Sequence, residues 1–391
     1  MRAVLVSVIA LFAGTGLLVL GNGLLGTLLG VRLSIQGAST LVTGLVMSAY
    51  FAGLVAGAGF GYRLIRGVGH IRVFAALASI YSAATLIHGL METPTLWATL
   101  RFIQGFCAAG LYMCIESWLN EKVTNTTRGA ILSLYMITQY VALGAGQYLL
   151  TLFDPTDFAQ LAVASVLVSM ALVPVALSRT PGPALPQPTV FGLRELVGIS
   201  PLGVVGCLAG GVAGGAFYGM GPVYAQRLGF DTQTIALFMV AAIAGGLLLQ
   251  WPLGKLSDRF DRRHVIFAMA LGTGLASLGA SFADDVGLWP LIGATLLFGG
   301  LAFPLYSISV AHANDYLDAS ELVPASGGLL LFYSVGSTIG PIATTVFMDT
   351  MGPDGLFLHL AVVSGLVALF ALWRMRVGFS LAPEEGAPYP P

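Results

Sequence analysis

Residues 232–282 read TQTIALFMVAAIAGGLLLQWPLGKLSDRFDRRHVIFAMALGTGLASLGASF. Two long apolar runs flank one short charged segment, and each is close to the roughly 20 residues that a helix needs to cross the hydrocarbon of a bilayer. A backbone surrounded by lipid must satisfy its own hydrogen bonds, so such runs form helices. This stretch therefore predicts two membrane-spanning helices joined by a basic turn.

The same alternation extends through the whole chain. Hydrophobic residues make up 57% of the sequence and charged residues only 9%, and the mean hydropathy is +0.87. The surface of a water-soluble protein needs more charge than this. We therefore predict an all-α membrane protein with 12 transmembrane helices. The predicted spans are 4–28, 40–62, 73–91, 95–119, 129–152, 158–177, 201–225, 232–253, 265–282, 288–312, 323–348 and 356–375.

The basic residues predict an orientation. If the N-terminus is cytoplasmic, 14 of the 17 Lys and Arg residues fall in inside segments, two (Arg32 and Arg227) fall outside, and Arg101 lies within a span. This positive-inside bias predicts that both termini are cytoplasmic. Arg2 precedes an apolar run as in a secretory signal, but the run has no clear cleavage site, so we expect the first helix to be retained.

A proline-rich segment predicts two halves. RTPGPALPQPT at 179–189 contains four prolines, and the short amphipathic stretch FGLRELVGI follows at 191–199. We predict an N-terminal six-helix half (1–178), a cytoplasmic linker with a short amphipathic helix (179–200), a C-terminal six-helix half (201–377) and a disordered cytoplasmic tail (378–391). Weak echoes at offsets of 192 and 194 residues, such as Leu96-Trp97 with Leu288-Trp289, favour a duplication, and secondary transporters are built from such halves with a site between them.

Several classes of function are disfavoured by composition and motifs. A net charge of −1 offers no case for a nucleic-acid partner. The three cysteines lack metal-ligand spacing, so we expect no metal and no cofactor. No GxxxxGK[ST], HExxH or GxSxG motif is present, which argues against ATP-driven transport and against an enzyme.

Four short motifs resemble those of a known family. Residues 254–263, GKLSDRFDRR, closely resemble a loop signature of the major facilitator superfamily, with Asp261 in place of its second glycine. RFIQG at 101–105 is similar to that superfamily's Arg-x-x-Gln-Gly element. Glu121 and Arg128 keep the spacing of its sugar-porter branch, and GSTIGP at 336–341 is similar to an antiporter element.

The resemblance implies a secondary transporter that works by alternating access. Its partners would be a small-molecule solute, the lipid bilayer and protons as the coupling ion, and it would be a monomer in the bacterial cytoplasmic (inner) membrane. Gly340-Pro341 favours export, whereas Glu121 and Arg128 favour uptake of a metabolite; a non-transporting scaffold or receptor is a third possibility. The loop signature implies a conformational latch, whose alternative is a topology-fixing basic loop with one ion pair. The latch residues are Gly254, Asp258, Arg259 and Arg262.

Three polar residues of the fourth span are candidates for proton coupling or substrate binding. Arg101 lies about six residues into its span, or roughly 9 Å deep, and a buried guanidinium normally faces a cavity or a partner. Gln104 lies on the same face, one turn further on. Glu116 is the only acid within a predicted span, and it lies too far along the helix to pair with Arg101. The alternatives are a structural cation that snorkels outward and an interfacial ion pair of Glu116 with Lys122, Arg128 or another helix.

Two further groups complete the prediction. The inner ends of the fourth and tenth spans predict a cytoplasmic gate, for which helix-end capping is an equal alternative; its residues are Glu121, Arg128, His312, Asn314 and Asp315. Uncharged polar and aromatic residues predict a cavity for a neutral, amphiphilic or weakly charged solute. The cavity residues are Asn22, Tyr50, Tyr112, Tyr135, Gln139, Gln147, Tyr218, Tyr306, Tyr333 and Ser337.

Overall fold

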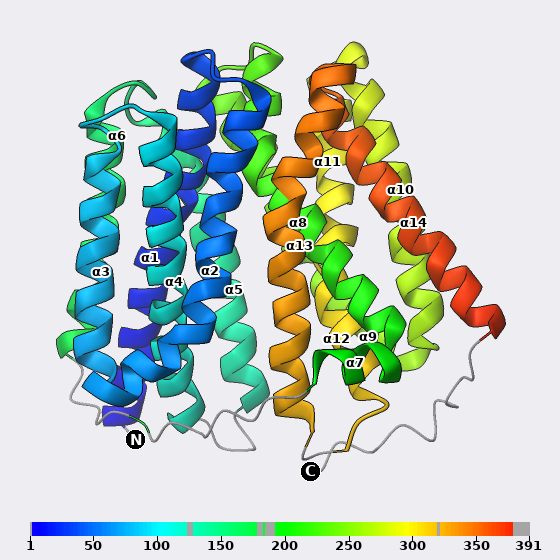
Figure 1. The fold of residues 1–391 in the computed structure, drawn as a ribbon, viewed down its shortest axis with the longest axis horizontal. Helices are drawn as coiled ribbons and strands as arrows, with labels where there is room; N and C mark the ends of the chain where they lie inside the picture. Colours follow the sequence, from blue (N-terminus) through cyan, green and yellow to red (C-terminus); the bar gives the residue numbers. More distant parts are fainter. Residues whose placement is uncertain (1, 123–127, 178–182, 184–191, 319–320, 378–391) are drawn as a thin grey trace. The chain divides into compact units, whose positions relative to one another are not determined.

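The computed structural model describes residues 2–122, 128–177, 183, 192–318 and 321–377, and every regular element in these residues is a helix (Figure 1). The first helices are α1 (Arg2–Ile35), α2 (Thr40–Val68), α3 (His70–Ile87), α4 (Pro94–Lys122), α5 (Arg128–Tyr148), the 3₁₀ turn η1 (Leu149–Thr151) and α6 (Phe158–Leu177). The later helices are α7 (Leu193–Ile199), α8 (Pro201–Arg227), α9 (Thr232–Arg259), α10 (Arg262–Val286), α11 (Leu288–Ala302), α12 (Leu305–Asn314), α13 (Leu322–Met351) and α14 (Gly355–Val377).

The helices form two compact units. The first unit comprises Met1–Pro186 and Gly229–Leu237, and the second comprises Gln187–Leu228 and Phe238–Pro391. The short helix α7 matches the predicted amphipathic stretch, and its Leu196 is buried in an apolar cluster with Ala325 and Leu329 of α13. Most of the proline-rich linker, like the tail 378–391, lies outside the described residues.

Eleven of the 12 predicted spans coincide with helices that are long and apolar enough to cross a membrane. The predicted span 129–152 corresponds to α5 and η1, which are not among them. Two glutamines and three tyrosines make α5 more polar than its neighbours, so the count of 12 remains a prediction.

Two boundaries differ from the prediction. The span 288–312 is not one continuous helix: α11 ends at Ala302 and α12 begins at Leu305, because Pro304 has no N–H to donate and its ring obstructs the preceding turn. The signature at 254–263 is not all loop either, since α9 continues to Arg259. Asp261 then caps α10 by accepting a hydrogen bond from the backbone N–H of Arg263.

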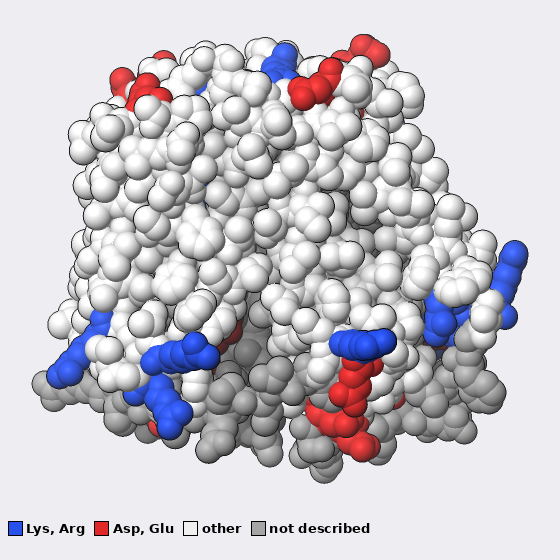
Figure 2. Space-filling view, viewed as in Figure 1, with Lys and Arg blue, Asp and Glu red and all other residues white. Residues whose placement is uncertain are grey.

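Within each unit most lysine and arginine side chains lie toward one end of the helices, where acidic side chains lie as well, whereas the other end is mainly acidic (Figure 2). Arg63 and Arg66 near the end of α2 lie at the basic end of the first unit, and Arg374 and Arg376 of α14 lie at the basic end of the second. We call the opposite ends the acidic ends. Arg32 is an exception at an acidic end, where it is 3% exposed and donates to the backbone carbonyls of Pro155 and Asp157.

Glycines allow α2 and α4 to touch backbone to backbone. A Cβ atom at Gly53 would overlap the carbonyl oxygen of Phe102, and one at Gly105 would overlap the carbonyl oxygen of Tyr50. Without a hydrophobic driving force between helices in lipid, close packing of small residues contributes much of the association. The contact at Gly105 also fixes the position of Tyr50 opposite α4.

The second unit repeats this contact. A Cβ atom at Gly245 of α9 would overlap the carbonyl oxygen of Leu296, and one at Gly299 of α11 would overlap that of Ala242. Gly245 follows Gly53 by 192 residues, and Gly299 follows Gly105 by 194 residues. These are the offsets of the internal echoes in the sequence, so the equivalent helices of the two units pack by the same device.

We expect Gly105→Ala to destabilise the protein, because the new methyl group can be accommodated only if the α2 backbone moves. Overpacking of this kind costs about 1–3 kcal/mol, or about 2–4 °C of melting temperature for each kcal/mol. Thermal unfolding of the purified protein in detergent measures the shift.

Gly59→Ala is the matched control, since Gly59 is an exposed glycine of α2 with nothing within 4 Å of its Cβ position. It should leave the melting temperature unchanged or raise it, because alanine has the higher helix propensity. Equal shifts in the two variants would show that the α2–α4 contact does not depend on Gly105.

Candidate functional site

Arg101 lies inside the first unit. Its side chain is 3% exposed, and its guanidinium carbon lies 4.3 Å from the centroid of the Tyr50 ring. Nε and Nη1 have no hydrogen-bond partner, and no carboxylate among the described residues forms an ion pair with it. The side chain thus points into the unit, and the alternative of a cation that snorkels outward does not describe this structure.

Three other helices supply the surroundings of Arg101. The Tyr81 hydroxyl of α3 donates a hydrogen bond of 2.7 Å to Oδ1 of Asn22 on α1, and the Asn22 side chain also hydrogen-bonds Tyr50. Tyr50 and Tyr81 both interact electrostatically with Arg101. One cation is therefore surrounded by phenol and amide groups, with no full negative charge among the described residues. We call Asn22, Tyr50, Tyr81 and Arg101 the arginine cluster.

Tyr81 is the member of the arginine cluster that the sequence did not reveal. It is fully buried in α3, one of several tyrosines in the predicted spans, and nothing in its local sequence marks it. Its contact with Asn22 joins residues 59 positions apart, so only the packing of α3 against α1 brings it to the site.

Gln104 hydrogen-bonds a neighbouring helix. Its Nε2 donates a hydrogen bond of 3.0 Å to Oγ1 of Thr85 on α3, while its Oε1 has no partner. The side chain is fully buried. Gln104 thus holds α4 to α3 one turn below Arg101, and it retains one free acceptor.

Glu116 lies on the exposed surface of α4 and pairs with α5. The Tyr135 hydroxyl donates a hydrogen bond of 3.2 Å to Oε1 of Glu116. Tyr112, on the turn of α4 before Glu116, interacts electrostatically with Glu116, Tyr135 and Tyr50. Tyrosines thus continue from the arginine cluster to Glu116, and among the described residues Glu116 forms no ion pair with Arg101.

Two further residues of the first unit that are predicted to line a cavity, Gln139 and Gln147, differ in their burial. Gln139 is half-buried on α5. Gln147, by contrast, is 1% exposed, accepts a hydrogen bond from Thr27 and donates to the carbonyl oxygens of Gly23 and Leu143. Its polar groups thus hold α5 against α1, and its place in a cavity lining stays a prediction.

The second unit contributes aromatic pairs in place of charge. The ring of Tyr218 stacks on Phe303 at 5.1 Å, and Tyr306 packs against Tyr333 at 4.8 Å. Ser337 donates a hydrogen bond to the Tyr333 carbonyl. At the repeat offsets, Ala242 stands at the position of Tyr50 and Thr295 at that of Arg101. The arginine cluster is therefore specific to the first unit.

The predicted latch forms a small network at the basic end of the second unit. Nη2 of Arg262 lies 3.3 Å from Oδ1 of Asp258, and its Nε lies 3.3 Å from Oδ2 of Asp315. Asp258 is 71% exposed whereas Asp315 is 31% exposed. Burial raises the pKa of Asp315 above its ordinary value, and the charge of Arg262 offsets part of that rise. Arg262 thus joins the end of α12 to the end of α9.

Two predicted latch residues lie outside this network. Arg259 is exposed, and no ion pair is recorded for it among the described residues. Gly254 has nothing within 4 Å of its Cβ position, so no close contact requires a glycine there. Asp261 pairs instead with Arg263, at 2.8 Å; burial acts to raise the pKa of Asp261, but the hydrogen bonds from Arg263 outweigh it, and the pKa lies below its ordinary value.

The predicted gate residues do not form one group. Asp315 belongs to the latch network, whereas His312 packs against Tyr316 at 5.3 Å. Asn314 ends α12 with a buried Oδ1 that has no partner. Glu121 is exposed at the end of α4 and interacts with His70. Arg128 begins α5, but its side chain lies outside the described residues, as does that of Lys122.

Comparison with known proteins identifies the class of this chain. The profile of the Major Facilitator Superfamily matches residues 11–251 and 234–388. An uncharacterized MFS-type transporter of Enterobacter sp. (strain 638) is 30% identical over 372 residues, which cover 93% of this chain and 95% of that protein. An uncharacterized MFS-type transporter of Yersinia enterocolitica is 30% identical over 376 residues, covering 94% and 95%.

Solved structures share the fold at low sequence identity. The nucleoside transporter NupG aligns with a TM-score of 0.74 at 14% identity, covering 96% of this chain and 100% of that one. A bacterial homolog to the human lysosomal transporter Spinster, inward-facing and occupied, aligns with a TM-score of 0.72 at 14% identity, covering 98% of each chain. The two relatives named above are described as MFS-type transporters. The chain thus belongs to the Major Facilitator Superfamily, as a multi-pass membrane protein of transporter type.

Proposed function

We propose that the protein is a secondary transporter that moves a small organic solute with one acidic or electron-rich group by alternating access, coupled to protons. The observation that carries the proposal is the buried guanidinium of Arg101, which has two unsatisfied nitrogens and no anionic partner among the described residues. The likeness to NupG and to the Spinster homolog supports the fold alone, so the solute class rests on the residues of this chain.

Burying the charge of Arg101 in a membrane helix has an energetic cost. A charged side chain within a membrane helix costs at least about 2.5 kcal/mol on insertion scales, and a cation–π contact returns about 0.5–2 kcal/mol. The Tyr50 ring therefore offsets part of the cost of burying Arg101. A negatively charged or electron-rich group on a bound solute would satisfy the free nitrogens and offset the rest.

The polar and aromatic side chains of each unit, taken separately, indicate the class of solute. Tyr50, Tyr81 and Asn22 offer apolar ring faces and a few polar atoms, and the second unit offers the Tyr218–Phe303 and Tyr306–Tyr333 pairs. Such surfaces suit an amphiphilic molecule with at most one charge. A multiply charged solute would need more cations than Arg101 provides.

Glu116 is the proposed proton carrier. It is the only acid in the predicted spans, and Tyr135 can donate to its ionised form but can also rotate away when it is protonated. The tyrosines between Glu116 and Arg101 offer a polar connection through which the charge of one group influences the other.

We further propose a membrane, an orientation in that membrane and a direction of transport. The charge asymmetry within each unit supports an orientation with the basic ends and both termini in the cytoplasm, in the bacterial inner membrane. Efflux is slightly favoured by Gly340-Pro341 in α13; uptake with a proton is the alternative, favoured by the spacing of Glu121 and Arg128. We propose that the two halves, 1–178 and 201–377, move against each other as a monomer.

We expect Arg101→Gln to abolish solute-specific flux. The experiment places the purified protein in liposomes under an imposed pH gradient and follows fluorescent amphiphiles in matched pairs, one with a single carboxylate and one neutral. Because the variant loses a hydrogen bond from a charged group, the transport rate of the carboxylate-bearing amphiphiles should fall at least about tenfold.

Arg63→Gln is the control, because Arg63 is an exposed arginine that also lies over an aromatic ring, that of Phe60 at 5.6 Å. It should retain wild-type flux. Flux that survives Arg101→Gln would contradict the role of the arginine cluster, and flux that ignores the gradient would contradict proton coupling.

We also expect the latch network to set the balance between outward-open and inward-open states. Exposed ion pairs contribute only about 0.2–1 kcal/mol, so Asp315→Asn should change the balance more than Asp258→Asn. Single reporter cysteines at the acidic end and at the basic end, in a background without the three native cysteines, report accessibility to a membrane-impermeant maleimide.

Asp318→Asn serves as the matched control, because Asp318 is exposed and follows Asp315 by one turn. Labelling at the two ends should change in opposite directions in Asp315→Asn and stay constant in Asp318→Asn. Identical labelling in all variants would mean that the network only fixes local helix ends.

A further inference from the structure

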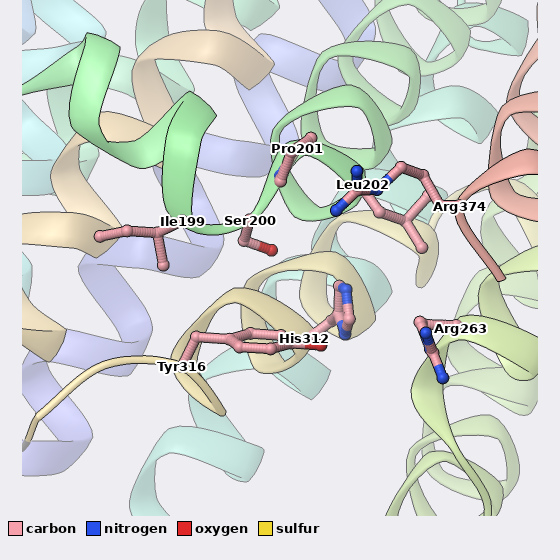
Figure 3. A pocket seen from close by; sticks show the side chains of 8 residues that line it. All are labelled: Ile199, Ser200, Pro201, Leu202, Arg263, His312, Tyr316 and Arg374. Carbon is pink, nitrogen blue, oxygen red and sulfur yellow. The ribbon is translucent and has the colours of Figure 1, made fainter. Parts of the chain in front are cut away.

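A polar cavity lies at the basic end of the second unit, and none of its lining residues belongs to the arginine cluster. Its volume is about 180 Å³. The residues that carry the argument come from four helix ends (Figure 3): Ser200 and Leu202 at the start of α8, Arg263 at the start of α10, His312 and Tyr316 around the end of α12, and Arg374 near the end of α14.

The start of α8 brings unsatisfied donors to this cavity. Pro201 occupies the first turn of α8, a helix of 27 residues, and the first N–H groups of a helix have no partner within it. Ser200, the N-cap residue, makes no capping hydrogen bond with its side chain. Its Oγ has no partner although the residue is only 2% exposed. A buried hydroxyl without a partner is costly, so its free state points to a missing ligand.

The other walls carry positive charge or further donors. Arg374 is half-buried, and no carboxylate among the described residues forms an ion pair with it. His312 is 5% exposed and Arg263 is 8% exposed. Arg263 is held by Asp261, the one carboxylate recorded next to this group. In Figure 3 the Ser200 hydroxyl, the His312 ring and the Arg374 side chain turn toward the same space.

We propose that this cavity binds a phosphate group, carried by the headgroup of an anionic phospholipid or by a soluble phosphate ester. The donors approach from several directions, which suits a tetrahedral oxyanion better than a planar carboxylate. Arginine and helix N-termini are both favourable phosphate ligands. The volume is below the roughly 300 Å³ of sites for drug-sized molecules, so the cavity accommodates a headgroup and not the transported solute.

A bound phosphate would connect α8, α10, α12 and α14, all of the second unit. It would thus fasten the basic end of this unit, next to the latch network that Arg262 and Asp315 form. In the proposed orientation this end meets the cytoplasmic leaflet, whose anionic lipids attract basic pockets between transmembrane helices. The site itself does not depend on what Arg101 binds.

The test measures the melting temperature of the full-length protein in detergent during titration with three probes. These are inorganic phosphate, dihexanoyl-phosphatidylglycerol, and dihexanoylglycerol, which has the same chains without the phosphate. Sodium chloride at equal ionic strength controls for screening. We expect saturable stabilisation by one or both phosphate probes and none by dihexanoylglycerol or salt.

Single substitutions test whether the phosphate group binds in this cavity. Arg374→Gln should raise the apparent dissociation constant for the phosphate probe at least about tenfold, and Ser200→Ala should raise it about threefold. Arg376→Gln is the control, because it changes an exposed arginine two residues further along α14, and it should leave the constant unchanged. Saturation by phosphatidylglycerol alone identifies a lipid, and saturation by inorganic phosphate identifies a soluble ester. No saturable shift, or equal affinity in all four proteins, would overturn the proposal.

Discussion

The backbone contact between α2 and α4 is the constraint on which the proposed site depends. Gly105 lies four residues after Arg101, on the same side of α4, and the carbonyl oxygen of Tyr50 occupies the space where any other residue would have its Cβ atom. This contact brings the Tyr50 ring over the guanidinium. Asn22 and Tyr81 then orient Tyr50 from α1 and α3. The same glycine contact therefore packs α2 against α4 and places the Tyr50 ring next to the charge of Arg101.

The two units share this packing but not this chemistry. Gly245 and Gly299 repeat the contact at the offsets of the internal echoes, yet Ala242, Thr295 and Phe298 stand where Tyr50, Arg101 and Gln104 stand in the first unit. A duplicated fold conserves its backbone contacts because they determine helix packing. The side chains that face away from those contacts are free to differ, and at these positions only the first unit carries a charge.

Much of the fold could be predicted from the sequence because lipid leaves few choices. Apolar length predicted eleven of the segments that are long and apolar enough to cross a membrane, one of which is divided between α11 and α12. The break at Phe303–Pro304 could not be inferred from the proline alone, because α6, α8, α9 and α13 continue through internal prolines. The helical extension of α9 to Arg259 could not be inferred from hydropathy, because interfacial charges do not end a helix.

The candidate site was harder to predict because its contacts are between helices. Arg101, Tyr50 and Asn22 were identified as single residues, but their meeting depends on how α1, α2 and α4 pack. The roles of Gln147 and Gln104 remain predictions for the same reason, since a polar side chain in a span can hydrogen-bond a neighbouring helix as well as a solute. Ser200 carried no sequence signal beyond its place before a proline.

The account holds that Arg101 is retained for transport at the expense of stability, and the melting temperature of Arg101→Met tests this most directly. A charged side chain within a membrane helix costs at least about 2.5 kcal/mol on insertion scales, and an apolar residue of similar length removes this cost. The account predicts a higher melting temperature than wild type in detergent, with Arg63→Met unchanged. A melting temperature below wild type for Arg101→Met would contradict it, because the guanidinium would then be a structural element of the first unit.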